Sequence, residues 1–197
     1  MANNKRDSRK LRLQVQMSVD GCIAGPNGEM DWMVGLLDDE LIKYANKITE
    51  PIDTILLGRE MTDVFISTWL DVMNKPDDPW YVFSKKMIET PKVVFTKTLN
   101  KSKWINTDII TGNLIEEVSK IKSQNSGDII VYGGASFDSS LIKEKLIDEF
   151  YLFTNPVAIG NGMTTFKDLN EIQKYTLIES KAFESGKVLP RYEAKRS

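Results

Sequence analysis

The 197-residue chain contains no histidine, and this absence excludes more chemistry than any other feature of the composition. Histidine is the usual general base, the partner of nucleophilic serine and cysteine, and the most common transition-metal ligand. Hydrolases built on a Ser-His or Cys-His pair are therefore excluded. The chemistry that remains has to rely on a cofactor, on carboxylates, on lysine or on an acid-rich Mg²⁺ site.

Cysteine and long apolar runs are also scarce. The single cysteine, Cys22, cannot form an internal disulfide, and we expect it to be a small buried hydrophobe. No apolar run approaches the roughly 20 residues that span a bilayer. Residues 1–10 are polar and lack the apolar stretch of a signal peptide, so we expect a flexible leader followed by one domain over 11–197. These features together favour a cytoplasmic protein.

Charge of either sign is nearly balanced. The 26 basic and 28 acidic residues give a net charge of −2 and are interspersed, so no field gathers nucleic acid or anionic lipid. We therefore expect neither nucleic acid nor a membrane as partner. A Mg²⁺ enzyme would need clustered carboxylates, and Asp77-Asp78 in a proline-containing loop is more typical of solvated charge, so we expect no metal.

The periodic segments predict an α/β fold. Leu11, Leu13, Val15 and Met17 alternate with polar residues, which is typical of a strand with one buried face. Further strands are expected at 54–57, 93–95, 129–132 and 148–157, and a final antiparallel hairpin at 175–193 that is broken at Gly186. Helices are expected at 41–48, 61–68, 85–88, 114–121 and 137–142. This order predicts a three-layer sandwich: a mixed, mostly parallel central sheet with helices on both faces and a C-terminal hairpin.

The segment Ile129 to Ser136 carries the first chemical signal. A buried strand runs into Gly133-Gly134, and Ser136 is a plausible cap for the helix that follows. Two missing side chains let a ligand approach the backbone, and free N–H groups at a helix start attract phosphate. The alternative is that the glycines only permit a tight turn.

Two other strand ends carry similar chemistry. Gly58-Arg59 places a cation at a helix start, where a bound anion or an acidic neighbour has to compensate it, with a surface ion pair as the alternative. Thr96-Lys97 adds a hydroxyl and an ammonium after the strand at 93–95. Because the carboxyl ends of parallel strands share one edge, these residues predict an anion-binding cleft there.

The loop Gly25 to Trp32 predicts a lid. Its glycines can act as hinges, and Trp32 can cover a reacting ring, although packing in the core is the alternative for this tryptophan. Asp31 and Asp38 are candidate site carboxylates, with helix capping as the alternative for acids that precede a helix.

An ordered series of motifs over 11–192 resembles the dihydrofolate reductase superfamily. The first strand and lid are Met17 to Ala24 and Gly25 to Trp32. The later motifs resemble the reductase domain of bacterial riboflavin biosynthesis, the C-terminal domain of a bifunctional deaminase-reductase: Leu146 to Glu149, Asn155-Pro156, Gly160 to Gly162, and Phe166.

The resemblance implies NADPH as the cofactor and a homodimer. It implies that the cofactor phosphates are lined by Gly58, Arg59, Thr96, Lys97, Gly133, Gly134, Ala135 and Ser136. It also implies that Ile23 and Ala24 lie near the nicotinamide, and that Trp32, Asp38 and Phe166 contact the substrate.

Two positions depart from the superfamily pattern. Met61 stands where a threonine often gives a hydroxyl to the pyrophosphate, so one cofactor contact is absent. Leu37 stands where folate reductases place a carboxylate that holds the pteridine, so folate is not the expected substrate.

The expected function is hydride transfer from NADPH to a small planar heterocycle of pteridine or pyrimidine type. It would resemble 5-amino-6-(5-phosphoribosylamino)uracil reductase, with Asp31 or a bound water as the proton source. The alternative is a non-catalytic nucleotide- or ligand-binding module that keeps the fold.

Overall fold

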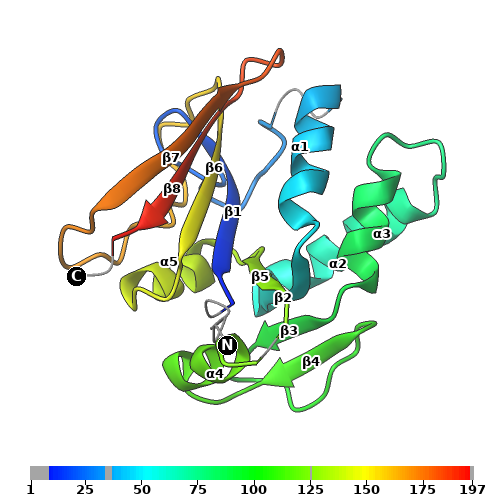
Figure 1. Cartoon of the computed structure of the whole chain (residues 1–197), viewed down its shortest axis with the longest axis vertical. Helices are drawn as coiled ribbons and strands as arrows, with labels where there is room; N and C mark the ends of the chain where they lie inside the picture. Colours follow the sequence, from blue (N-terminus) through cyan, green and yellow to red (C-terminus); the bar gives the residue numbers. More distant parts are fainter. Residues whose placement is uncertain (1–8, 34–36, 125, 196–197) are drawn as a thin grey trace, which may run out of the picture.

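The computed structural model describes residues 9–33, 37–124 and 126–195. Its centre is an eight-stranded sheet with the order β4-β3-β2-β5-β1-β6-β8-β7 (Figure 1). All pairs from β4 to β6 are parallel, and β6-β8 and β8-β7 are antiparallel. The strands are β1 (Leu11–Ser18), β2 (Ile52–Gly58), β3 (Lys92–Phe95), β4 (Thr107–Ile110), β5 (Asp128–Val131), β6 (Glu149–Asn155), β7 (Tyr175–Ala182) and β8 (Val188–Ala194).

Helices cover both faces of the sheet. They are α1 (Asp39–Thr49), α2 (Arg59–Met73), α3 (Tyr81–Glu89), α4 (Leu114–Lys122) and α5 (Ala135–Lys143). Residues of α4 and α5 share one core cluster with Leu11 and Leu13 of β1, and residues of α1, α2 and α3 bury two further clusters. In Figure 1, α4 and α5 lie on one side of the sheet and α1, α2 and α3 on the other. The predicted three-layer fold with its C-terminal hairpin is confirmed.

Two details differ from the expected elements. Residues 107–110 form β4, a four-residue strand paired in parallel with β3 that the sequence did not predict. The N-cap of α5 is Gly134, with φ 140°, whereas Ser136 lies inside the helix. The assignment of Ser136 as the cap was wrong, because the backbone already turns into the helix at the second glycine.

The end of the predicted leader is held by the domain. Arg9 is buried, pairs with Asp53, and donates from Nη1 to the carbonyl oxygen of Ile121 at 3.0 Å. Lys10 pairs with Glu149 at 2.6 Å. These two residues therefore differ from the expectation of a flexible segment, and residues 1–8 of the leader lie outside the described ranges. Among the helices of those ranges, none is long and apolar enough to cross a bilayer.

Candidate functional site

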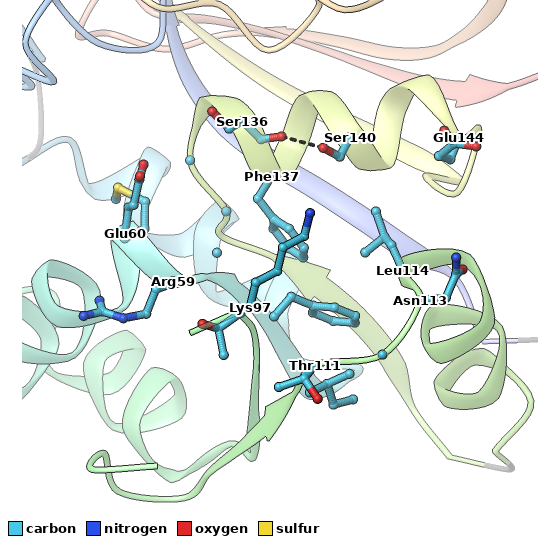
Figure 2. A pocket seen from close by; sticks show the side chains of 18 of the residues that line it. Arg59, Glu60, Lys97, Thr111, Asn113, Leu114, Ser136, Phe137, Ser140 and Glu144 are labelled. Atoms are coloured by element: carbon cyan, nitrogen blue, oxygen red, sulfur yellow. Dashed lines mark hydrogen bonds between the residues drawn. The ribbon is translucent and has the colours of Figure 1, made fainter. Parts of the chain in front are cut away.

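A cleft of about 790 Å³ opens where β2, β3, β4 and β5 end (Figure 2). Parallel strands bring their carboxyl ends to one edge of the sheet, which is where open α/β sheets bind ligands. The volume lies within the range of about 300–1,000 Å³ that is common for small-molecule sites. The lining includes seven of the residues expected at the phosphates: Gly58, Arg59, Thr96, Lys97, Gly133, Gly134 and Ser136.

Two helices start at this cleft without a side-chain cap. The N-caps of α2 and α5 are Gly58 and Gly134, and no side chain of the described residues accepts a hydrogen bond from either first turn. By contrast, Asp38 caps α1 and Asn113 caps α4. The first N–H groups of a helix lack partners within the helix and carry the positive end of its dipole. The cleft is therefore lined by two N-termini that are suited to bind an anion.

The glycines of the cleft also have packing reasons. A Cβ on Gly134 would lie 2.8 Å from Cγ of Met61, and the backbone there has φ 140°, which L side chains rarely adopt. A Cβ on Gly58 would lie 2.9 Å from Cβ of Phe137. The two interpretations of these glycines, a ligand-binding backbone and a steric requirement of the turn, therefore do not exclude each other. Packing explains why the residues are glycine, and the uncapped N-termini are the observation that points to a ligand.

The two cations expected at the phosphates are oriented differently. Figure 2 shows Lys97 projecting across the cleft toward α5, while Arg59 turns away from it. The Arg59 guanidinium lies 3.4 Å from the Asp63 carboxylate and 5.4 Å from the ring centroid of Trp104. The positive charge of Arg59 is therefore compensated by the ion pair with Asp63, as the alternative in the sequence analysis stated. No described carboxylate pairs with Lys97, which leaves its ammonium available to a ligand.

Asp138 is a buried acid behind the diglycine that the sequence analysis missed. It lies in the first turn of α5, is 3% exposed, and its Oδ1 has no partner among the described residues. Burial raises the pKa of its carboxyl to about 8, although the N–H of Gly133 donates to it and opposes this rise. The signal in the sequence was weak, because an acid in a first helical turn is usually a solvated partner of the dipole.

The expected lid is closed on itself by local hydrogen bonds. The N–H of Gly25 donates to the carbonyl oxygen of Glu29 at 2.8 Å, and Nε1 of Trp32 donates to the same oxygen at 2.9 Å. Trp32 is half-buried and belongs to none of the core clusters, while Asp31 is exposed. The structure therefore places Trp32 against its own loop, and the next residues, 34–36, lie outside the described ranges.

Asp20 joins the end of β1 to the Gly160-Asn161-Gly162 segment. Its carboxylate accepts from the N–H of Gly160 at 2.6 Å and from the hydroxyl of Ser18. These hydrogen bonds, the one from Ser18 first, lower the pKa of Asp20 to about 2. Ile23 and Ala24 then pair with Met163 through backbone hydrogen bonds of 2.8 and 2.9 Å. The segment expected at the nicotinamide is thereby fixed beside the end of β1.

The residues expected at the substrate do not come together. Asp38 caps α1 and also accepts from the N–H of Ser185 at 3.0 Å. Phe166 stacks on Phe150 with ring centroids 6.3 Å apart, in the core cluster on the α4 and α5 side. Ala135, Ile23 and Ala24 are not part of the cleft lining. Within the described ranges no group of three or more cysteine, aspartate and glutamate side chains is arranged to hold a metal ion.

Comparisons with known proteins agree with this architecture. The family model described as the RibD C-terminal domain matches residues 9–189. In Bacillus subtilis strain 168, the relative named "Uncharacterized protein YyaP" is 36% identical over 196 residues, which is 95% of this chain and 96% of the relative. A second protein of that strain, "Uncharacterized protein YwjB", is 28% identical over 89% of this chain and 92% of its own length.

Solved structures share the fold at lower identity. A putative riboflavin biosynthesis protein of Shewanella sp. PV-4 has a TM-score of 0.74 at 20% identity, and the match covers 95% of this chain and 99% of that one. A diaminohydroxyphosphoribosylaminopyrimidine deaminase/5-amino-6-(5-phosphoribosylamino)uracil reductase of Thermotoga maritima has a TM-score of 0.67 at 15% identity, with 95% of this chain covering 57% of that one. The resemblance read from the motifs is confirmed, and the chain belongs to the RibD C-terminal domain family.

Proposed function

We propose that this protein is an NADPH-dependent reductase whose acceptor is a small planar heterocycle of pteridine or pyrimidine type. The observation that carries the proposal is the pair of uncapped helix N-termini at the cleft, together with the ammonium of Lys97, which no described carboxylate pairs with. A dinucleotide has a central diphosphate, and this donor set fits two adjacent phosphate groups. Family membership supports the same activity.

In this proposal the chain's own groups bind and orient the cofactor. The free N–H groups at the starts of α2 and α5 hold the diphosphate, and Lys97 neutralises part of its charge from the opposite wall. NADPH supplies a hydride to the acceptor. A protein without histidine can support this chemistry, because it needs only orientation, exclusion of water and a proton source.

The acceptor would lie at the end of β1, next to Ile23 and Ala24. The loop from Gly25 to Trp32 would limit access of water to the transferred hydride. Asp31 is exposed, so we propose that it delivers the proton either directly or through a water molecule. A homodimer in the cytoplasm completes the proposal.

Met61 favours a second candidate, a module that binds a nucleotide without turnover. Its side chain covers Gly134, at the position where a threonine hydroxyl would reach the pyrophosphate. Tight NADPH binding without oxidation across a panel of pterins, pyrimidines and quinones would support this candidate. Steady oxidation of NADPH with any of them would exclude it.

Titration with NADPH tests the proposed function. We expect quenching of tryptophan fluorescence and a rise in melting temperature at millimolar NADPH, since a ligand that binds only the folded state stabilises it. Lys97→Ala removes a charge-assisted contact and should weaken NADPH affinity about 10- to 100-fold. Lys47→Ala, an exposed lysine of α1, is the matched control and should leave the affinity unchanged. Absence of both effects in the wild type would refute cofactor binding.

A further inference from the structure

A row of polar side chains crosses the centre of the sheet on the α1 side. β1 lies between β5 and β6, and its Leu11 and Leu13 belong to the core on the opposite face. Arg12, Gln14 and Gln16 therefore face α1, and Arg12 donates to the carbonyl oxygen of Ile48 in that helix. We call these three residues the polar row. The buried apolar residues on this face form two separate clusters, one under α2 and α3 and one under α1.

Polar groups at the centre of a sheet need partners, and the row has them. Arg12 pairs with Asp128 and lies 3.6 Å from Glu149. Oε1 of Gln14 is 2.7 Å from the hydroxyl of Tyr132. Arg12 therefore forms internal ion pairs. The two glutamines are half-buried, and in the described part of the chain only their oxygens have hydrogen-bond partners.

The orientation of the Gln16 amide is fixed by its neighbours. Nδ2 of Asn155 donates to the carbonyl oxygens of Met17 and Phe153, both at 3.2 Å, so Asn155 also presents nitrogen to Gln16 at 3.1 Å. Nζ of Lys187, which can only donate, lies 3.0 Å from the same Oε1. Both contacts require the oxygen of Gln16 on that side. Its NH₂ group is therefore directed away from them, and no described residue accepts a hydrogen bond from it.

Lys187 is unusual because its side chain is fully buried. Apart from Gln16, the group that faces it is the carboxylate of Asp38 at the start of α1, and burial lowers the pKa of the Lys187 ammonium to about 8. Keeping a lysine here is costly for folding. A role for Lys187 in holding the Gln16 amide explains why a polar side chain occupies the site.

The polar row lies beside both parts of the proposed site. Tyr132, the partner of Gln14, directly precedes Gly133 at the cofactor cleft. Gln16 is two residues from Ser18, whose hydroxyl accepts from the N–H of Cys22 at 2.9 Å, next to Ile23 and Ala24. A ring at the end of β1 would thus have the free NH₂ of Gln16 on its α1 side.

We propose that Gln16 is a specificity-determining residue that donates a hydrogen bond to the acceptor ring, with Lys187 and Asn155 as positioning residues. This inference rests on the proposed function, because it assigns the substrate side of the same site. A fixed donor selects an edge that carries a carbonyl oxygen and disfavours an amino group at that place. The substrate class is therefore a carbonyl-bearing heterocycle such as a uracil.

The test exchanges the donor for an acceptor without loss of the Lys187 contact. In Gln16→Glu the carboxylate still accepts from Lys187 and Asn155, so the fold should be retained. Binding of 5-aminouracil and of 2,4-diaminopyrimidine is measured by equilibrium dialysis with NADP⁺ present. We expect the wild type to prefer 5-aminouracil about tenfold, as for one hydrogen bond, and Gln16→Glu to prefer the diamine. Gln173→Glu, a half-buried glutamine elsewhere, is the control and should keep the wild-type preference.

The role of Lys187 is tested by the ratio of the two affinities. Lys187→Met removes one of the two donors that fix the amide and leaves Gln16 held by Asn155 alone, so the preference should fall toward onefold. A merely structural role would change both affinities equally and leave their ratio unchanged.

The outcomes separate this inference from the proposed function. NADPH binding is measured on the same samples by fluorescence, and its absence in the wild type would refute the cofactor site, whatever the pyrimidines do. With NADPH binding intact, three results would each overturn the role of Gln16. These are failure of the wild type to bind 5-aminouracil at millimolar concentration, an unchanged preference in Gln16→Glu, or an unchanged ratio in Lys187→Met. Reversal of the preference in Gln16→Glu together with its loss in Lys187→Met would support the role.

Discussion

Replacement of Asp138 by asparagine should make the protein more stable, and increasingly so as the pH rises. The carboxyl is buried behind Gly133, and burial raises its pKa to about 8 in the folded state. In the unfolded chain it has the ordinary value of 3.8. Between these values the folded state holds a proton that the unfolded state has released. The free energy of unfolding therefore falls as the pH rises from about 4 to about 8.

The size of the effect follows from the two pKa values. Each pH unit in this window costs about 1.4 kcal/mol for one group, so wild-type stability should fall by up to about 4 kcal/mol between pH 5 and pH 8 through Asp138 alone. Asparagine has nearly the same shape and does not ionise. The stability difference between Asp138→Asn and wild type should therefore grow by that amount over the same range.

Guanidinium denaturation at pH 5, 6.5 and 8 measures this difference, because other titrating groups act equally on both proteins and cancel. Asp168→Asn, at an exposed aspartate, is the matched control for the loss of one carboxylate. A pH-independent difference for Asp138→Asn would show that the carboxyl is ionised in the folded protein. The account of its burial would then be wrong.

Three further changes test other parts of the structure. Arg9→Ala removes a buried guanidinium that pairs with the half-buried Asp53 and donates to the carbonyl oxygen of Ile121, so it should lower the free energy of unfolding by about 1–3 kcal/mol, measured by urea denaturation. Gly134→Ala introduces a Cβ at φ 140° and against Met61, so it should lower the melting temperature, with a cost of about 1–3 kcal/mol. Met61→Thr opens that contact and adds a hydroxyl at the cleft, and NADPH titration should show affinity raised about five- to tenfold.

Much of the fold could be predicted because the local sequence periodicity matches the helices and strands that pack in the tertiary structure. The helices expected at 61–68 and 114–121 lie within α2 and α4 of the structure. The cleft residues were also readable, since strand-to-helix junctions of a parallel sheet must share one edge. β4 was missed because four residues at a sheet edge give too short a periodic signal. The part of the cleft lining that follows this strand, Thr111 to Leu114, was missed for the same reason.

The substrate residues were the part that sequence reasoning could not place. Asp38 and Phe166 look equally available in the sequence, yet one caps a helix and the other packs on the opposite face of the sheet. Which face a side chain reaches depends on strand order, and that order is set by crossovers and not by local pattern. Motif order alone therefore identified the family but not the substrate side of the site.

β1 shows how a known strand order changes the meaning of one pattern. Alternation of apolar residues with Arg12, Gln14 and Gln16 predicts a strand with one solvated face, and that is the usual interpretation for an antiparallel or edge strand. In this sheet β1 is an interior parallel strand with helices on both faces, where near-continuous apolar residues are expected. Polar side chains at such positions oppose folding unless they have partners, and the described residues supply partners only for the oxygen of Gln16. The alternating pattern was first interpreted as a strand with a solvent-exposed face. Because the strand is central, the same pattern instead indicates a polar surface that can bind a ligand.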